Sequence, residues 1–411
     1  MNIWIFQTGE PLHIDKENYR PMRAMNLANM LIDQGHAVTI WSSAFFHQEK
    51  KHRTREYKKI KYNELLEIRL IPSSGYIKNI SVQRLYDHAM LAMNLNKALK
   101  KEIILPDVAF IGYPPIEFAY VAQIWLKNKN IPTMLDIKDL WPEIFISSFH
   151  KIFRNFIKIF LFPYFYLAKK VINNATVVSS MTNAFLSHTI NLYGRKVSEK
   201  DLAFPFSNPK IKVSSDDLNA NKKWWLDNWI DQNKLFRISY VGNISSNIDI
   251  ASIKEAALYF EKKIEFVICG DGPLFEFYKK KFNGILNVKF PGRVNHLKAA
   301  GLYELSQAMI IPYKNSKDFQ LSLPNKFIDA LTYGLPVISP LSGEVAKMIN
   351  KHNIGISYGK PFNLTLIDAL STLLKNDLNK IVNNSRKIYH EKFSFEKVYN
   401  DLANHLVKLK I

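Results

Sequence analysis

Lys326 and Asp329 stand three residues apart in a segment whose pattern is typical of an anion site. The segment predicts a helix that begins near Pro324 and ends at Gly334, followed by a short apolar strand over 336–339. The unpaired N–H groups at the start of a helix favour a bound phosphate or carboxylate. Lys326 would add a positive charge in the first turn, and Asp329 would lie close enough to contact the ligand. The segment therefore predicts a place where an anionic ligand binds.

Glycine turns follow several of the predicted strands, and glycine lets the backbone approach a phosphate or a sugar closely. A single glycine is equally compatible with a simple tight turn, and no turn here has the third glycine of a dinucleotide-binding fingerprint. Arg293, after a further strand, fits a base or phosphate contact and an ordinary surface position about equally. The turn residues are Gly9, Gly242 with Asn243, and Gly270 with Asp271 and Gly272.

Four acidic residues close to the ends of predicted strands are candidates for orienting a substrate hydroxyl. An aspartate at the end of a buried strand is also often a helix cap, and for Asp139 the capping role is at least as strong a hypothesis. We predict that Glu10 and Asp139 act in catalysis together with Lys326. The four acids are Glu10, Asp136, Asp139 and Glu143.

Short apolar runs alternate with helical patterns along the whole chain, which predicts an α/β protein with parallel sheets. A helix over about 21–34 connects the first two strands. The predicted strands are Ile3–Phe6, Ala37–Trp41, Val108–Gly112, Thr133–Asp136 and Thr176–Ser179 in the first half, and Arg237–Val241, Glu265–Cys269, Val288–Phe290, Ala308–Ile311 and Pro336–Ser339 in the second.

The chain length of 411 residues fits two domains better than one core. Pro205 and Pro209 lie close together and discourage both helix and sheet, so the segment 204–209 is the predicted boundary. We expect an N-terminal domain over 1–204, a C-terminal domain over 210–388, and a last segment over 389–411 that crosses back to the first domain. The aromatic segment around Trp225 is expected to pack against the second domain.

The composition limits the class of protein. No run reaches about 20 apolar residues without a charge, so no membrane-spanning helix is expected, and the first residues predict a strand rather than a signal peptide. The single cysteine, Cys269, excludes an intrachain disulfide and fits a reducing cytoplasm. No cluster of cysteine and histidine has the spacing of a zinc site, and no Asp-x-Asp metal motif is present.

The segment 322–339, the turn 268–273 and the strand with its loop over 240–244 together resemble the donor-binding parts of glycosyltransferase family 4, the retaining enzymes with the GT-B fold. The N-terminal strand and the segment 135–143 resemble the branch that builds bacterial surface polysaccharides such as O-antigen and capsule. The resemblance implies two Rossmann-like domains that face each other across a central cleft. The N-terminal domain would bind the acceptor, and the C-terminal domain would bind the nucleotide sugar.

The resemblance also implies a site and a mechanism. In this family the acceptor hydroxyl attacks the face from which the phosphate departs, so the protein supplies position and charge and no nucleophile, metal or cofactor. Asp329 aligns with the second glutamate of the family's paired-acid motif, which holds the nucleotide ribose. The predicted donor-binding residues are Gly9, Gly242, Asn243, Gly270, Asp271, Gly272, Arg293, Ser322, Leu323, Asn325, Lys326 and Asp329.

Three positions depart from the family pattern. Leu321 occupies the place of the first acid of the pair, so Asp318 or the backbone of 320–322 would have to supply the sugar contact. Asn243 replaces the usual arginine and Asn247 the usual lysine after the second-domain glycine. Lys326, Arg293 or Arg195 would then compensate. These losses also fit a catalytically inactive protein that binds nucleotide sugars and supports an active enzyme.

The segment 151–170 is basic and aromatic and contains no acid. On one helix, Phe153, Phe156, Phe160, Tyr164 and Leu167 would share a face, with Lys151, Arg154, Lys158 and Lys169 nearly opposite, which is typical of a helix in a membrane interface. The alternative is a helix that packs in the core and exposes its basic face to solvent. The basic run 50–61 fits a solvated loop by itself and is predicted to share the membrane role. The predicted membrane or acceptor residues are Arg23, Lys151, Arg154, Phe156, Lys158 and Phe160.

The net charge of +20 favours a polyanionic partner. Nucleic acid is one such partner, but no nucleic-acid-binding motif is recognised. We expect transfer of a sugar, most plausibly an N-acetylated amino or deoxyamino sugar, from a UDP-sugar to a polyprenyl-diphosphate-linked saccharide. The protein would be cytoplasmic and bound peripherally to the anionic inner face of the cell membrane. A glycosyltransferase with a soluble acceptor is the nearest alternative.

Overall fold

The structure, a computed structural model, describes the chain except residues 16–18, 80, 148–150, 210–213, 231, 233–234 and 411, and it also leaves out the side chains of Ser147 and Lys151. The contact pattern divides the chain into two units. The first unit consists of Met1–Pro205 and Val398–Ile411, and the second of Phe206–Lys397. Helix α17 (Phe395–Val407) begins in the second unit, and from Val398 onward it belongs to the first.

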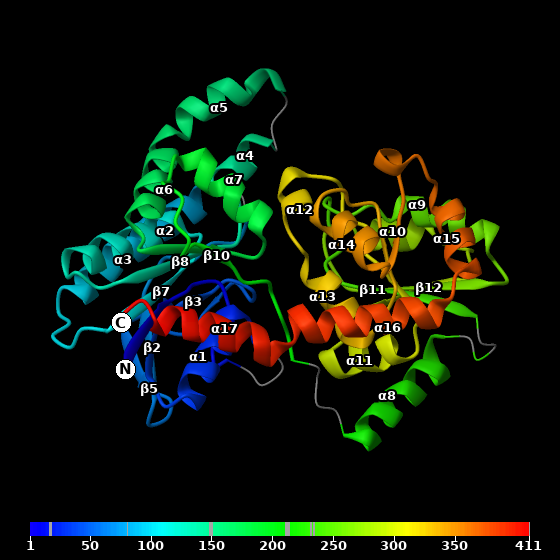
Figure 1. Cartoon of the computed structure of the whole chain (residues 1–411), viewed down its shortest axis with the longest axis horizontal. Coiled ribbons are helices and arrows are strands. Elements are labelled where there is room, and N and C mark those ends of the chain that lie inside the picture. Colours follow the sequence, from blue (N-terminus) through cyan, green and yellow to red (C-terminus); the bar gives the residue numbers. More distant parts are fainter. Residues whose placement is uncertain are drawn as a thin grey trace. The chain divides into compact units, whose positions relative to one another are not determined.

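The first unit contains a twisted sheet with the strand order β10-β9-β8-β7-β1-β2-β6-β5 (Figure 1). All its paired strands are parallel except β5, which runs antiparallel to β6 at the edge. The strands are β1 (Asn2–Phe6), β2 (Ala37–Ser43), β5 (Lys58–Lys61), β6 (Leu66–Ile71), β7 (Val108–Tyr113), β8 (Thr133–Ile137), β9 (Val177–Ser180) and β10 (Leu202–Ala203), and β3 (Phe45–Phe46) and β4 (Lys51–His52) form a separate small hairpin.

Helices cover this sheet. Helices α2, α3, α6 and α7 pack in a row, each against the next, and α1 lies beside α17, where Asn26 donates to the Tyr399 hydroxyl (3.3 Å). The helices of the first unit are α1 (Arg23–Asp33), α2 (Val82–Leu99), α3 (Ile116–Asn128), α4 (Glu143–Ser147), α5 (Arg154–Phe160), α6 (Phe162–Asn174) and α7 (Asn183–Tyr193), with a short 3-10 turn at Lys151–Phe153.

The second unit contains a fully parallel sheet with the order β13-β12-β11-β14-β15-β16. Its strands are β11 (Phe236–Val241), β12 (Ile264–Cys269), β13 (Val288–Gly292), β14 (Ala308–Ile310), β15 (Val337–Ser339) and β16 (Gly355–Ser357). Its helices are α8 (Ser215–Asn228), α9 (Ala251–Tyr259), α10 (Phe275–Lys281), α11 (His296–Glu304), α12 (Lys317–Leu321), α13 (Asn325–Tyr333), α14 (Glu344–His352), α15 (Leu366–Lys375) and α16 (Leu378–Ile388), with a 3-10 turn at Lys360–Phe362 and a π-helical turn at Tyr389–Phe393.

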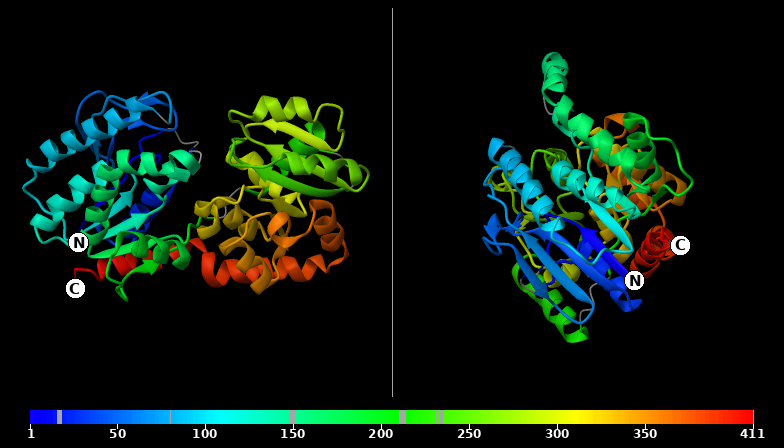
Figure 2. Two further views of the ribbon diagram at one scale, coloured as in Figure 1. Left: turned by 90° about the horizontal axis from the view of Figure 1, so that it is seen from above. Right: turned by 90° about the vertical axis from the view of Figure 1, so that its left-hand side faces the viewer.

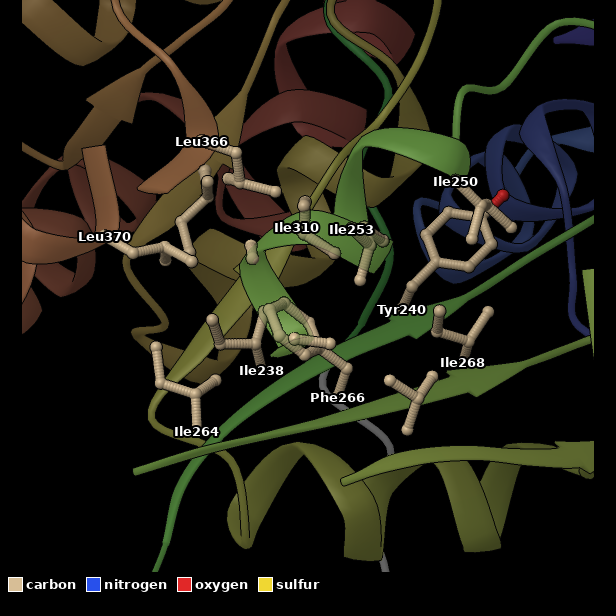
Figure 3. Packing of buried hydrophobic residues seen from close by; sticks show 14 of the residues in the cluster. Ile238, Tyr240, Ile250, Ile253, Ile264, Phe266, Ile268, Ile310, Leu366 and Leu370 are labelled. Atoms are coloured by element: carbon tan, nitrogen blue, oxygen red, sulfur yellow. The ribbon is translucent and has the colours of Figure 1, made fainter. Parts of the chain in front are cut away.

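Aliphatic and aromatic side chains from neighbouring strands form the core of the second unit. Ile238, Tyr240, Phe266 and Ile268 of β11 and β12 pack against α9 and α15, as Figure 3 shows. Beta-branched residues suit the pleated surface of a buried parallel sheet. The core therefore holds the carboxyl ends of β11 and β12 in fixed positions relative to each other.

The predicted fold class is confirmed: both units are Rossmann-like α/β domains. Each predicted strand is present within two residues of its predicted bounds. The sequence analysis missed β5, β6, β10 and β16 and the hairpin β3–β4. The basic run 50–61 is therefore not a loop throughout, because it contains β4 and β5.

Candidate functional site

In each sheet the strand order reverses direction at one point, and α/β domains bind ligands at the carboxyl ends of the strands at such a point. In the second unit the reversal lies between β11 and β14. Backbone hydrogen bonds join the loop after β11 to the end of β12 and the turn that follows it. The Gly242 N–H donates to the Cys269 carbonyl oxygen (3.0 Å), and the Ile244 N–H donates to the Asp271 carbonyl oxygen (2.7 Å). The turn after β12 is also bound to β13, because the Gly270 N–H donates to the Gly292 carbonyl oxygen (2.8 Å).

The glycines of these loops are required by close packing. Gly270 has a φ of +143°, and a Cβ at this position would collide with the carbonyl oxygen of Gly242. A Cβ at Gly272 would collide with the Asn243 side chain and the carbonyl oxygen of Ile244. The two predicted glycine turns thus lie against each other.

Helix α13 begins after Pro324 and ends at Gly334, whose φ of 68° is left-handed, so the predicted bounds of this helix are confirmed. No side chain caps its N-terminus. Lys326 Nζ lies 3.1 Å from Asp329 Oδ2, and Asp329 is buried. The Lys326 side chain also passes beside Gly242, since its Cε is 3.4 Å from the position a Gly242 Cβ would take. The structure thus brings Gly242, Lys326 and Asp329 together.

Two tyrosines support this loop, and the sequence analysis did not select them. The Tyr240 hydroxyl donates to the carbonyl oxygen of Asn243 (3.0 Å) and is hydrogen-bonded to Tyr313. Burial raises the pKa of both hydroxyls, and the Asp329 carboxylate further raises the pKa of Tyr313. Both tyrosines therefore stay protonated as hydrogen-bond donors. Tyr313 lies just after the predicted strand 308–311. Its place at the end of a strand was the feature of the sequence that could have indicated a role in the site.

The other predicted donor-binding residues of the second unit differ in exposure, and Gly9, which was also predicted, belongs to the first unit. Asn243, Asp271 and Asn325 are exposed, whereas the Leu323 side chain belongs to an apolar cluster of the core and Ser322 is buried. Arg293 is 75% exposed, and its guanidinium lies 3.7 Å from the Asp271 carboxylate. Leu323 thus has a packing role, while Arg293 is exposed at the end of β13.

Arg195 does not compensate for the missing lysine. Its guanidinium is buried in the first unit, where it binds Asp201 (3.0 Å) and the carbonyl oxygens of Ile172 and Ala175. The Arg195 side chain thereby links the end of α6 to the loop before β10. Asn247 itself is exposed, and its carbonyl oxygen accepts the Lys314 N–H (2.9 Å).

The first unit has a pocket of about 210 Å³ at its own reversal point, between β1 and β7. The loop after β1, with Gly9 and Glu10, forms one part of the pocket, and the loop after β8, with Lys138 and Asp139, forms another. Further polar residues of the lining, which were not predicted from the sequence, come from the end of β2, the turn between β3 and β4, the loop before α2 and α2 itself. These residues are Ser43, His47, Tyr76, Arg84, Asp87 and His88.

Glu10 and Asp139 both line this pocket but differ in their partners. The Glu10 carboxylate is buried, accepts the N–H of Ala24 at the start of α1 (2.9 Å) and forms an ion pair with Lys138. Asp139 is exposed at the pocket, and the protein atoms packed around it raise the pKa of its carboxyl, an effect that Lys138 and Arg84 oppose. Glu10 therefore anchors α1, whereas Asp139 is an exposed carboxyl group in the lining of the pocket.

Arg23 and Asp136 lie away from any surface. Their side chains form a buried ion pair (2.9 Å), Arg23 also donates to the Pro205 carbonyl oxygen (3.0 Å), and the Ser179 hydroxyl donates to Asp136 (2.8 Å). Arg23 is thus not a membrane contact, because its guanidinium is used inside the first unit. Glu143, the fourth predicted acid, is paired with His188 (2.9 Å).

The predicted single helix over 151–170 is divided in two. Helix α5 ends at Phe160 and α6 begins at Phe162, with Pro163 in its first turn. Proline cannot donate to the carbonyl oxygen one turn earlier, so the helix is interrupted before it. No residue of α5 is buried, and Phe156 (60%) and Phe160 (69%) are exposed. The Lys151 side chain, a predicted contact, lies outside the described part of the structure.

The described residues offer neither a metal site nor a membrane-spanning helix. In that part of the chain, no group of three or more His, Cys, Asp or Glu side chains is placed to hold a metal ion. No helix of the described residues has the length and apolar character needed to cross a bilayer.

Residues 236–376, which include the glycine loops and α13, match the family model of the Glycosyl transferases group 1. This part of the chain is therefore similar to group 1 glycosyltransferases. The match contains Gly242, Gly270 and the Lys326–Asp329 pair, so the candidate site of the second unit lies within the matched residues. No curated protein sequence matches the chain.

Solved structures show the same fold over nearly the whole chain. Sucrose-phosphate synthase from Thermosynechococcus elongatus aligns with a TM-score of 0.73 at 14% identity, over 99% of this chain and 98% of that one. WaaG, a glycosyltransferase involved in lipopolysaccharide biosynthesis, aligns with a TM-score of 0.65 at 13% identity, over 99% of each chain. HepE from Anabaena, in complex with UDP, aligns with a TM-score of 0.62 at 13% identity, over 99% of each chain. The chain therefore has the GT-B fold.

Proposed function

We propose that this chain is a retaining glycosyltransferase that transfers a sugar from a UDP-sugar to an acceptor hydroxyl. The observation that carries the proposal is the convergence of two glycine loops and the Lys326–Asp329 pair at the reversal point of the second unit. Nucleotides bind at this place in α/β sheets. HepE, which has a related fold, was solved with UDP and glucose, and this supports a UDP-sugar as donor.

In this proposal each residue of the donor site has a defined task. The uncapped start of α13 and the ammonium of Lys326 bind the diphosphate and stabilise the charge that develops as UDP departs. Asp329 accepts hydrogen bonds from the ribose. The bond between the anomeric carbon and the UDP oxygen breaks, the acceptor oxygen bonds to the same face, and the departing diphosphate takes the acceptor proton. We propose that neither a metal nor a cofactor takes part.

The direct test measures nucleotide binding through its effect on the melting temperature of the full chain. UDP, GDP and ADP are titrated with and without EDTA, and a ligand at a hundredfold excess over its Kd stabilises by about 2.7 kcal/mol. We expect a shift with UDP that survives EDTA and that is weakened by Lys326→Gln. The matched control is Lys347→Gln, which removes an exposed lysine with the same spacing to an acid on α14 (Lys347–Glu344, 2.7 Å).

No shift with any nucleotide would sink this proposal. A shift without turnover of any UDP-sugar would instead favour the inactive-partner alternative, in which the missing acid at Leu321 and the missing lysine at Asn247 have abolished catalysis but not binding. Detectable turnover with any UDP-sugar would exclude that alternative.

We further propose that the acceptor is a polyprenyl-diphosphate-linked saccharide and that the protein works peripherally at the cytoplasmic face of an anionic membrane. Helix α5 supports this: it extends away from the sheet of the first unit (Figures 1 and 2). Exposed aromatic and aliphatic residues surround Arg154 and Lys158, and no acidic residue occurs between Glu143 and Glu199. The exposed apolar residues are Ile152, Phe153, Phe156, Ile159, Phe160, Phe162 and Tyr166.

Such a surface fits the interface of an anionic bilayer, where apolar side chains insert and cations bind lipid headgroups. WaaG, whose fold is shared, is involved in lipopolysaccharide biosynthesis, and this supports a role in surface polysaccharide synthesis with an N-acetylated amino or deoxyamino sugar. A soluble acceptor is the alternative, and binding to lipid separates the two.

The membrane proposal is tested by co-sedimentation with vesicles of anionic or zwitterionic lipid at low salt. We expect binding to the anionic vesicles, reduced at least tenfold by the double variant Phe156→Ser, Phe160→Ser, since each buried phenylalanine contributes about 1.5–3 kcal/mol. Phe277→Ser is the control, because Phe277 is equally exposed (58%) but lies in the second unit. Equal sedimentation of wild type and double variant would remove α5 from the proposal.

A further inference from the structure

Three basic side chains gather around the ring of Tyr76. His47 and Arg84 line the pocket of the first unit together with Tyr76, and Lys50 lies next to them. Lys50 Nζ lies 3.0 Å from His47 Nδ1 and 4.3 Å from the centre of the Tyr76 ring. The Arg84 guanidinium lies 5.4 Å from the same centre. The residues come from the turn before β4, from the loop before α2 and from α2 itself. We call His47, Lys50, Tyr76 and Arg84 the basic wall.

Asp87, Glu10 and Glu117 near the basic wall have partners of their own, whereas the charge of Arg84 acts on Asp139. Asp87 is buried on α2 and accepts the N–H of Gly75 and the hydroxyl of Ser74 (3.4 Å). Glu10, across the pocket, holds Lys138 and the start of α1. Behind the wall, His88 lies between Arg84 Nε (3.4 Å) and Glu117 (3.6 Å). Asp139 is exposed at the loop after β8.

The electrostatics indicate that the wall carries more positive charge than its neighbours balance. Burial lowers the pKa of Lys50 to about 8, and the repulsion from Arg84 exceeds the attraction from Asp87. Burial, Lys50 and Arg84 lower the pKa of His47 to about 4, so this imidazole is neutral near pH 7. Lys50 also has a φ of 56°, an uncommon conformation for a residue other than glycine. Such strained positions often lie at binding sites.

We propose that the basic wall binds a phosphate or diphosphate group of the acceptor. The inference rests on the proposed function and names the chemical group that the pocket of the first unit recognises. A phosphate dianion would accept charge-assisted hydrogen bonds from the Arg84 guanidinium and the Lys50 ammonium. The pocket of about 210 Å³ has room for such a group. The group can belong to a polyprenyl diphosphate or to a soluble sugar phosphate.

The test is calorimetric titration of the full chain with sodium pyrophosphate in saturating UDP, which occupies the donor site. We expect binding that Arg84→Gln and Lys50→Gln each weaken about tenfold. The control is Lys97→Gln, which removes an exposed lysine from the same helix as Arg84. Melting temperatures of the variants show whether they remain folded. Wild-type pyrophosphate affinity in both wall variants, or no binding of pyrophosphate at all, would overturn the inference.

Two further ligands separate the possible sources of the phosphate. Farnesyl diphosphate is a short polyprenyl diphosphate, and glucose 6-phosphate is a soluble sugar phosphate. Binding of either one that depends on Arg84 supports the wall and identifies the acceptor class. The result is also separable from the donor proposal: UDP binding without pyrophosphate binding overturns only the wall, and pyrophosphate binding without UDP binding overturns only the donor site.

Discussion

The two units place their candidate sites at the same point of the fold but handle charge differently. In the second unit, both cations near the reversal point have an acidic neighbour, Lys326 with Asp329 and Arg293 with Asp271. The glycine loops and the start of α13 lie beside Lys326, so an anion bound there would meet backbone N–H groups as well as this cation. In the first unit, the basic wall holds cations that its acids do not balance. Backbone geometry therefore defines one site, and side-chain charge defines the other.

The difference between a structural and a ligand-binding arginine in the first unit gives the largest expected effect. Arg23→Met should lower the free energy of unfolding by about 3–5 kcal/mol, because it leaves Asp136 buried without its cation. Arg84→Met, which removes an arginine of the basic wall, should change stability by less than about 1 kcal/mol. Urea denaturation measures both. Similar losses in the two variants would show that Arg84 is also a structural residue.

Gly270→Ala tests whether backbone packing defines the site in the second unit. The added Cβ collides with the carbonyl oxygen of Gly242, so we expect a loss of about 3 kcal/mol in the free energy of unfolding, together with weaker UDP binding. Gly284→Ala is the matched control, because Gly284 has a φ of +84° with open space around it. It should cost about 1 kcal/mol, the strain of the left-handed conformation alone. Normal UDP binding by Gly270→Ala would refute the need for close packing.

The excess charge of the basic wall predicts a smaller, pH-dependent effect. Lys50 faces His47, Tyr76, Arg84 and Asp87, and its pKa of about 8 lies below the ordinary value of 10.5. Between these values the unfolded chain binds more protons, so the Lys50 contribution to stability should rise with pH. The slope should stay well below about 1.4 kcal/mol per pH unit, the value for one full proton, because solvent screens the partly exposed Lys50.

The measurement compares wild type and Lys50→Gln by urea denaturation between pH 7.5 and pH 9.5. The range stops there because the tyrosines of the unfolded chain begin to ionise near pH 10. The difference in unfolding free energy should change in favour of the wild type as the pH rises. A constant difference would show that the charge of the basic wall is balanced.

The sequence was most informative where local rules and the fold agree. Pro324 and Gly334 predicted both ends of α13, because one suits a helix start and the other a left-handed helix end. The buried strands were found from their short apolar runs, whereas the edge strands β5 and β16 were missed because they are short or polar. The break at Leu161 was missed because the helical pattern of 151–170 continues across Pro163, which is tolerated in the first turn of a new helix.

Local sequence patterns were enough to predict the α/β class, the glycine turns and the bounds of the helix that contains Lys326, since each depends on neighbouring residues and their periodicity. Which charged residues meet depends on the tertiary fold. It buried Arg23 against Asp136, used Arg195 to bind the end of α6, and grouped His47, Lys50 and Arg84 around Tyr76. The physical reason is that charge interactions act over a few ångströms in space, and residues 23 and 136 come within that range only when the sheet has formed.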